Sequence, residues 1–186
     1  DYRLNSSNAS KDEETRDFVF SQASSFRESL IAQLGTRPLS DLERRITEYI
    51  IGNIDEDGYL RRDIENIVDD LAFGAGIEVS EEEVLRLLKI IQEFEPAGVG
   101  ARDLKECLLL QIQHKLNENP EHKLLQDAKA ILEECFEEFS RKHYEKISRK
   151  LRLSDTELKQ AIDEILKLNP KPGGTVADFS YGQQAE

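Results

Sequence analysis

Apolar residues recur along most of the chain at intervals of three and four positions, which is the spacing of one face of an α-helix. No segment alternates apolar and polar residues with a period of two, so the pattern predicts an all-α fold. The segments that carry the helical spacing lie at residues 26–34, 42–50, 64–71, 84–91, 104–112, 124–139, 144–151 and 158–166.

Four Ser-x-x-Glu strings stand just before apolar segments, and each has the signature of a helix capping box. Asp63 stands in the same place before residues 64–71. These residues predict where the helices begin. The four strings pair Ser25 with Glu28, Ser40 with Glu43, Ser80 with Glu83, and Ser154 with Glu157.

A polar, turn-rich stretch at residues 117–120 follows the fifth predicted helix and is the preferred position for a domain boundary. We therefore expect a two-lobed helical bundle, with a larger lobe at residues 18–118 and a smaller three-helix lobe at 121–168. Residues 1–17 hold few apolar side chains and are expected to form a flexible acidic linker. Residues 169–186, rich in Gly, Pro and Gln, are expected to be an extended tail.

The charge balance limits the partners that the chain can have. It carries 38 Asp and Glu residues against 25 Lys and Arg, a formal net charge of −13, so nucleic acid would be repelled by the molecule as a whole. No apolar run approaches the ~20 residues that cross a bilayer. The polar start does not fit a signal peptide. We therefore expect a cytoplasmic protein with no membrane partner.

The reactive residue types form no recognisable catalytic or metal-binding pattern. Cys107 and Cys135 lie among apolar residues, so we expect two buried reduced thiols and no disulfide. The three histidines lack zinc-ligand spacing and stand near no obvious nucleophile. We expect a protein that is not an enzyme and that needs no metal or cofactor.

Residues 53–60 are similar to the first half of a calcium-binding EF-hand loop, with Asp55, Asp57 and Gly58 at the matching positions. Such a loop closes with a bidentate carboxylate at its twelfth position, and here that position is Ile64. Because too few oxygens remain for the ion, we expect a tight turn. In it, Asp side chains would accept backbone N–H groups and Gly58 would take a positive φ.

The glycine-rich segment at residues 94–103 invites comparison with a phosphate-binding loop. It lacks the Gly-Lys-Ser/Thr end of a P-loop and the third glycine of a dinucleotide-binding turn. We expect a connection between helices, in which Pro96 ends one helix and Asp103, with Glu106, begins the next.

Residues 141–168 have the pattern of a helix-turn-helix, with Arg152 and Leu153 in the turn. The second helix, which would enter a DNA groove, is acidic, and the first is basic. The charges therefore favour a protein partner or glancing phosphate contacts, and a simple solvated helix face is the plain alternative. The basic patch consists of Arg141, Lys142, Lys146, Arg149, Lys150 and Arg152.

Three strings together resemble the core-binding region of bacterial sigma-54 factors. They are IIGNIDEDGYL at residues 50–60, EPAGVGARDLKECLLLQ at residues 95–111 and LNPKPG at residues 168–173. Their order and spacing extend the resemblance over about residues 24–174, and the acidic start looks like the end of that family's variable linker.

The resemblance implies a function that the residues alone do not. Sigma-54 factors bind RNA polymerase core and direct it to a distinct promoter class, where the complex waits for an ATP-hydrolysing activator. We expect the core enzyme to be the partner of this chain. The activator and promoter DNA would be contacted only through regions that the sequence lacks. The chain itself is expected to be a monomer.

The resemblance also implies three sets of motif residues. The first would shape a turn and consists of Asp55, Asp57, Gly58 and Tyr59. The second would fix the connection into the next helix and consists of Pro96, Gly98, Gly100, Ala101, Arg102, Asp103, Glu106 and Cys107. The third would form a rigid exit toward a DNA-binding half and consists of Asn169, Pro170, Pro172 and Gly173.

Glycine and proline in these sets are expected to hold the fold, whereas Arg102 and Tyr59, if exposed, are candidates for contact with polymerase. Two other classes stay open at this point. One is a helix-turn-helix regulator that binds DNA through residues 141–168, and the other is a calcium-responsive helical protein that uses residues 53–60.

Overall fold

The computed structural model describes residues 14, 16 and 25–174. Within that part the chain is helical and has no strand, which confirms the all-α prediction, and only two isolated β-bridges occur. Residues 25–34 are helical, and the start of this helix lies outside the described residues. The helices that follow are α2 (Asp41–Gly52), α3 (Ile64–Ala75), α4 (Glu81–Ile91), α5 (Leu104–Glu118), α6 (Lys123–Glu134), α7 (Phe136–Ser140), α8 (Tyr144–Leu151) and α9 (Asp155–Leu166).

The predicted serine caps at the starts of α2, α4 and α9 are confirmed. Ser40, Ser80 and Ser154 each accept a hydrogen bond from the backbone N–H three residues on. In α2, the Ser40 backbone N–H and the Arg86 guanidinium both bond Glu43, and together they lower the pKa of this carboxyl to about 2. Asp63 is the N-cap residue of α3 but makes no side-chain capping bond.

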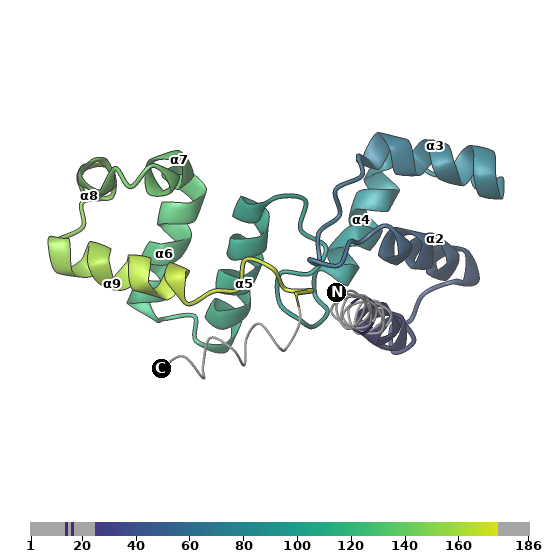
Figure 1. Ribbon diagram of the computed structural model, residues 1–186, viewed down its shortest axis with the longest axis horizontal. Helices are drawn as coiled ribbons and strands as arrows, with labels where there is room; N and C mark the ends of the chain where they lie inside the picture. The colour runs from purple at the N-terminus through teal and green to yellow at the C-terminus, as the bar shows by residue number, and fades with distance from the viewer. Residues whose placement is uncertain (1–13, 15, 17–24, 175–186) are drawn as a thin grey trace, which may run out of the picture.

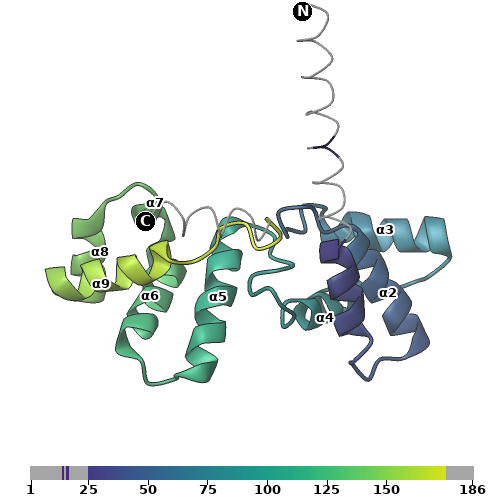
Figure 2. The same cartoon turned by 60° about the horizontal axis from the view of Figure 1, so that its bottom comes forward.

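Buried apolar side chains form two clusters. The first cluster comes from residues 30–99 and joins the first helix, α2, α3 and α4, and the second cluster comes from residues 108–168 and joins α5 to α9. Figures 1 and 2 show the helices in two corresponding groups, with α5 beside α6. A small third cluster, made by Tyr59, Ala101 and Cys107, belongs to the segments between the two groups.

The division between the clusters differs from the predicted boundary at residues 117–120. Leu108, Ile112 and Leu116 place the apolar face of α5 in the second cluster, so α5 belongs with α6 and not with the helices before it. The core therefore divides between residues 99 and 108. The C-terminal group consequently holds α5 to α9, more than the three helices expected at residues 121–168.

The single helix expected over residues 124–139 is also interrupted. Cys135 has φ −132° and ψ 30°, which ends α6, and α7 starts at the next residue. The bend lets Phe136 and Phe139 pack against the second cluster. Cys107 and Cys135 are both buried and unpaired, as predicted. Among the described residues, no helix combines the length and apolar character that spanning a bilayer requires.

Candidate functional site

The first of the three strings forms a tight turn built around Asp55. Asp55 Oδ1 accepts hydrogen bonds from the backbone N–H of Asp57 (2.9 Å) and of Tyr59 (3.0 Å), and Gly58 has φ +96°. Arg61 Nε donates to the other carboxylate oxygen at 3.0 Å. Both oxygens are therefore used within the turn. This geometry is the predicted turn, and the described residues contain no group of three His, Cys, Asp or Glu side chains placed to hold a metal ion.

The second string forms a compact connection from α4 to α5. Gly98 and Gly100 have positive φ, +97° and +80°, and a Cβ on Gly98 would lie only 2.9 Å from Cys107 Sγ. Asp103 is the N-cap of α5, and its Oδ1 accepts from the backbone N–H of Glu106 at 2.8 Å. The expectation that Pro96 and Asp103 frame a structured helix connection agrees with this geometry, and the Glu95–Pro96 peptide bond is cis.

These two segments lie against each other. The backbone N–H of Gly100 donates to Gly58 O at 2.9 Å, and the N–H of Leu60 donates to Ala101 O at 2.9 Å. A parallel bridge joins Tyr59 to Ala101. The first two strings are thus hydrogen-bonded to each other, although about 40 residues separate them in the sequence.

The third string returns from the end of α9 to the same place. Gln111 Nε2 donates to Asn169 O at 2.6 Å, and the Asn169 N–H donates to Gln111 Oε1 at 2.9 Å. Tyr59 Oη donates to Pro170 O, and the backbone N–H of Gly173 donates to Asp57 O at 2.9 Å. We call residues 55–60, 95–107 and 169–174 together the junction.

Residues 169–174, which the resemblance implied would form a rigid exit toward a DNA-binding half, are therefore hydrogen-bonded into the junction. The approach is closest between two glycines. A Cβ on Gly58 would lie 2.7 Å from the backbone N of Gly173, and a Cβ on Gly173 would lie 2.6 Å from the backbone N of Gly58. Residues 175–186, the rest of the predicted tail, lie outside the described residues, as does most of the predicted linker at 1–17.

The centre of the junction is apolar and protected from water. Tyr59 is only 4% exposed, and burial, with the Cys107 thiol nearby, raises its pKa well above the usual value. Burial likewise raises the pKa of the Cys107 thiol, which therefore stays protonated at neutral pH. Neither group is activated for chemistry, and the arrangement holds two parts of the molecule together.

Tyr59 and Arg102 were expected to contact a partner if exposed, and the two side chains differ in solvent exposure. Tyr59 is buried, so it is not available for such a contact. The side chain of Arg102 is 48% exposed and pairs with Glu106 Oε2 at 3.2 Å. Arg102 is thus the one of the two that a partner can reach.

Two glutamines that no prediction assigned to the site are central to it. Gln111 bonds both polar backbone atoms of Asn169, and Gln92 Nε2 donates to Gly100 O (3.0 Å) and to Glu106 Oε1 (2.9 Å). Gln111 interrupts the apolar face of α5, and this position was a usable signal of a buried polar contact. Gln92 offers no such signal, because it follows the last turn of α4 in an ordinary polar position.

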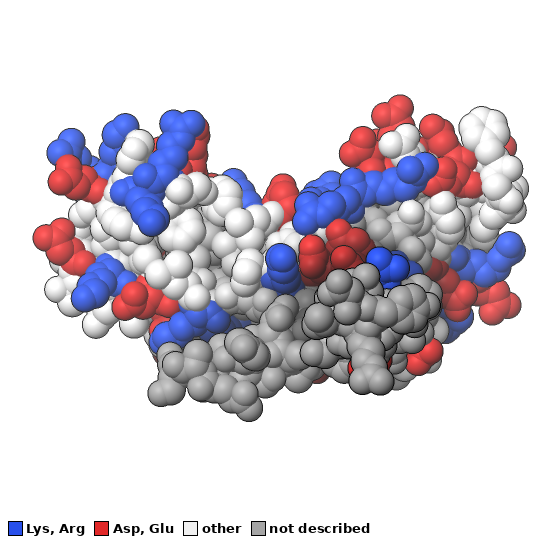
Figure 3. All heavy atoms as spheres, viewed as in Figure 1, with Lys and Arg blue, Asp and Glu red and all other residues white. Residues whose placement is uncertain are grey.

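The basic patch lies away from the junction, on α8 and on the connections before and after it. All six of its side chains are exposed, and blue side chains gather over the region of α7 and α8 in Figure 3. Arg141 pairs with Glu137 at 2.9 Å, and Lys150 Nζ donates to Glu134 O at 2.9 Å. As predicted, α8 and α9 are joined by a turn at Arg152, which has φ +56°.

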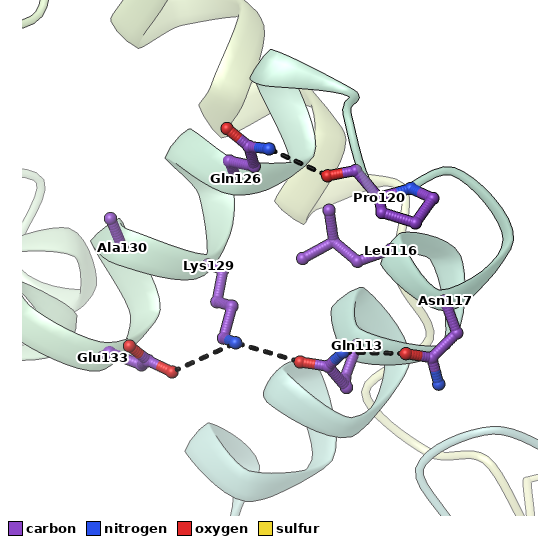
Figure 4. A pocket seen from close by; sticks show the side chains of 8 residues that line it. All are labelled: Gln113, Leu116, Asn117, Pro120, Gln126, Lys129, Ala130 and Glu133. Atoms are coloured by element: carbon purple, nitrogen blue, oxygen red, sulfur yellow. Dashed lines mark hydrogen bonds and ion pairs between the residues drawn. The ribbon is translucent and has the colours of Figure 1, made fainter.

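A polar groove of about 550 Å³ lies between α5 and α6, next to the predicted boundary at residues 117–120. Figure 4 shows hydrogen bonds among the residues that line it: Lys129 Nζ donates to Gln113 Oε1 at 3.0 Å, and Gln126 Nε2 donates to the backbone carbonyl of Pro120 at 2.8 Å. These polar atoms already have partners, so the groove gives no sign of a ligand.

The fold and the junction define an all-α module in which loop motifs hold two groups of helices together. The family model for the sigma-54 factor core binding domain matches residues 16–184. The chain belongs to this family, as its three strings indicated.

Curated relatives agree with the family model. The chain is 35% identical to the RNA polymerase sigma-54 factor of Azotobacter vinelandii over 94% of its own length and 34% of the relative. For the sigma-54 factor of Pseudomonas aeruginosa the identity is 35% over 92% of this chain and 34% of the relative. For that of Escherichia coli it is 33%, over 79% and 30%. The chain thus spans about a third of the length of these relatives.

Proposed function

We propose that this chain docks a sigma-54 initiation factor onto RNA polymerase core. The polymerase can then be directed to its promoters and await an ATP-hydrolysing activator. The observation that carries the proposal is the match of the core binding domain family to residues 16–184, a range that contains all three strings of the junction. The activator and promoter DNA would be met through other parts of the factor, and the module would act as a cytoplasmic, non-catalytic monomer.

The structure supports docking in two ways. The junction ties both groups of helices to each other, so they can present one continuous surface to a large partner. The net charge of −13 is also compatible with a protein partner and unfavourable for a phosphate backbone. Within the junction, Arg102 is our candidate contact because its guanidinium is exposed while Glu106 holds it in place.

The helix-turn-helix alternative is less well supported. In that case α9 would enter the major groove, but α9 and its N-terminal turn carry Asp155, Glu157, Asp163 and Glu164. Carboxylates in that position would face phosphates and the electronegative groove. Sequence-specific DNA binding by residues 141–168 would require the acidic helix α9 to contact the bases.

The test is direct binding of the 186-residue chain to purified RNA polymerase core, measured by biolayer interferometry and by co-elution in gel filtration. We expect saturable binding at a ratio of one chain to one core enzyme. The variant R102A should bind more weakly than the unmodified chain, and K105A, a nearby change on α5, serves as its control. Absence of binding at micromolar concentrations of both partners would contradict the proposal.

A further inference from the structure

The end of α3 carries an aromatic side chain that the fold does not use. Phe73 lies in the last turn of α3 and is 89% exposed, more than any other large hydrophobic side chain in the described residues. Helix α3 buries Ile67 and Leu71 against the first cluster, which leaves Phe73 in solvent. Isolated surface apolar residues are common, so a role for Phe73 needs further support from its surroundings.

Such support comes from an open groove of about 540 Å³ next to Phe73. Its wall is held by a chain of hydrogen bonds in which Arg62 donates to both carboxylate oxygens of Asp70 (2.6 and 2.9 Å) and Tyr49 Oη donates to Asp70 Oδ2 (2.7 Å). The same bonds lower the pKa of Asp70, so it stays charged at neutral pH. A wall fixed in this way is already formed before a partner arrives, which reduces the ordering that binding requires.

Gly74 lines the same groove, and the fold gives no reason for a glycine there. Its φ is not positive, and a Cβ at this position would meet no other atom within 4 Å. Glycine inside a helix lowers the stability of the fold relative to alanine, so helix stability does not explain the presence of Gly74. Its absent side chain leaves room for another backbone to approach α3 beside Phe73.

The charges around this groove specify the kind of partner. Two carboxylates, Asp69 and Asp70, line the groove together with no Lys or Arg, and the Arg62 guanidinium outside the lining pairs with Asp70. The last turn of α3 contains no basic residue, and a helix C-terminus itself carries partial negative charge. Figure 3 shows acidic side chains gathered over the region of α3. A partner segment with Lys or Arg beside its apolar residues would be attracted here.

We infer that the groove at the end of α3, with Phe73 as its anchor, is a docking surface for an apolar segment of RNA polymerase core that is flanked by Lys or Arg. The inference rests on the proposed function and gives it a location. Interfaces commonly depend on a few aromatic anchors near their centre, with charged groups around them that select and orient the partner.

The test compares single variants of the full chain in the binding assay with RNA polymerase core. F73A should weaken binding at least tenfold, and D69K, which reverses a charge in the groove, should weaken it and reduce its salt dependence. The matched control is L166A, because Leu166 is also a large exposed side chain (68%) but lies on α9 in the other group of helices. L166A should bind within twofold of the unmodified chain. All three variants should keep the melting temperature of the unmodified chain, since the changed side chains face water.

The outcomes separate this inference from the function on which it rests. Equal affinity of F73A and the unmodified chain would overturn the inference and leave the proposed function in place. Failure of the unmodified chain to bind would overturn the proposed function itself. A concentration-dependent dimer that F73A converts to monomer would assign this surface to a second copy of the chain, and would also overturn the inference.

Discussion

At the scale of single residues, the junction depends on places where a side chain is missing. Gly58 combines a positive φ with a backbone-to-backbone approach to Gly173, so any Cβ there would meet both strain and a clash. Gly98 also has a positive φ, and a Cβ there would clash with Cys107 Sγ. The sequence indicated that Gly58 would turn the chain, but the facing glycine at position 173 could not be deduced from local pattern.

The variant G58A should therefore destabilise the protein. The left-handed conformation alone costs an L-residue roughly 1–2 kcal/mol, and displacement of Gly173 adds to it. The measurement is the free energy of unfolding from urea titration followed by circular dichroism. The matched control is G52A, where a Cβ would meet nothing within 4 Å and a gain of about 0.4–1 kcal/mol is expected. Equal stability of G58A and the unmodified chain would contradict the tight approach described here.

Tyr59 should make the stability of the junction sensitive to alkaline pH. Its pKa in the folded state is raised, so the fold favours the neutral phenol. The resulting stability is fully present below the unfolded pKa of about 10 and is lost as pH rises above it. Y59F should lower the free energy of unfolding at pH 7 by about 1 kcal/mol, because the bond to Pro170 O is lost.

The same variant should lose part of the decline that the unmodified chain shows as the pH rises through about 10. Urea titrations at matched pH values measure both effects. An unchanged alkaline decline in Y59F would mean that other groups, such as the buried thiols, account for it.

At the scale of helices, local pattern located most elements and left their partners undefined. Ser40, Ser80 and Ser154 marked helix starts because a capping bond involves only the next three residues. The apolar face of α5 was visible in the sequence, but nothing local says whether Leu108 and Ile112 meet α4 or α6. The interruption at Cys135 was equally hidden, because its neighbours on both sides continue the helical spacing.

Helix α8 should bind duplex DNA negligibly at physiological salt. The basic patch is exposed, but Lys150 and Arg141 already have acceptors at Glu134 O and Glu137, and α9 beside them is acidic. Electrostatic attraction beyond ~8 Å is screened under these conditions, so the mixed local charge decides the outcome. Fluorescence anisotropy with a labelled duplex measures it.

A micromolar affinity that falls steeply with salt, and that R149A/K150A abolishes, would contradict this expectation. Each neutralised phosphate would then add about −0.9 to the slope of log affinity against log salt. T156A, a neutral change of an exposed side chain near the start of α9, provides the control for the double variant.

At the scale of the whole molecule, the sequence indicated two groups of helices but placed their division too late. Residues 117–120 looked like a linker because they are polar and turn-rich, yet they only reverse the chain between the packed helices α5 and α6. The segment that does join the groups, residues 99–107, is buried at residues 99–101 and at Cys107, and it overlaps the glycine-rich part of the second string. Its connecting role became visible only with residues 169–174 in place.

Removal of the third string should free the two groups of helices from each other. A chain that ends at Leu168 keeps the second cluster but loses the bonds from Gln111, Tyr59 and Asp57 to residues 169–173. We expect ¹⁵N relaxation to show different rotational correlation times for the two groups. A chain that ends at Gly174 is the control and should tumble as one body. Identical tumbling of both truncated chains would show that residues 99–107 suffice.

The return of residues 169–174 to the turn at 55–60 also has a consequence for the order of folding. The hydrogen bond from Tyr59 to Pro170 spans 111 positions, and closing so long a loop in an unfolded chain is entropically unfavourable. The helices of each cluster, whose contacts are mostly closer in sequence, can form before that loop closes. Once they have formed, the ends of the loop are already held near each other. The contacts of residues 169–174 with the turn at 55–60 should therefore be the last to form, and the two clusters should be kinetically separable before they become one cooperative unit.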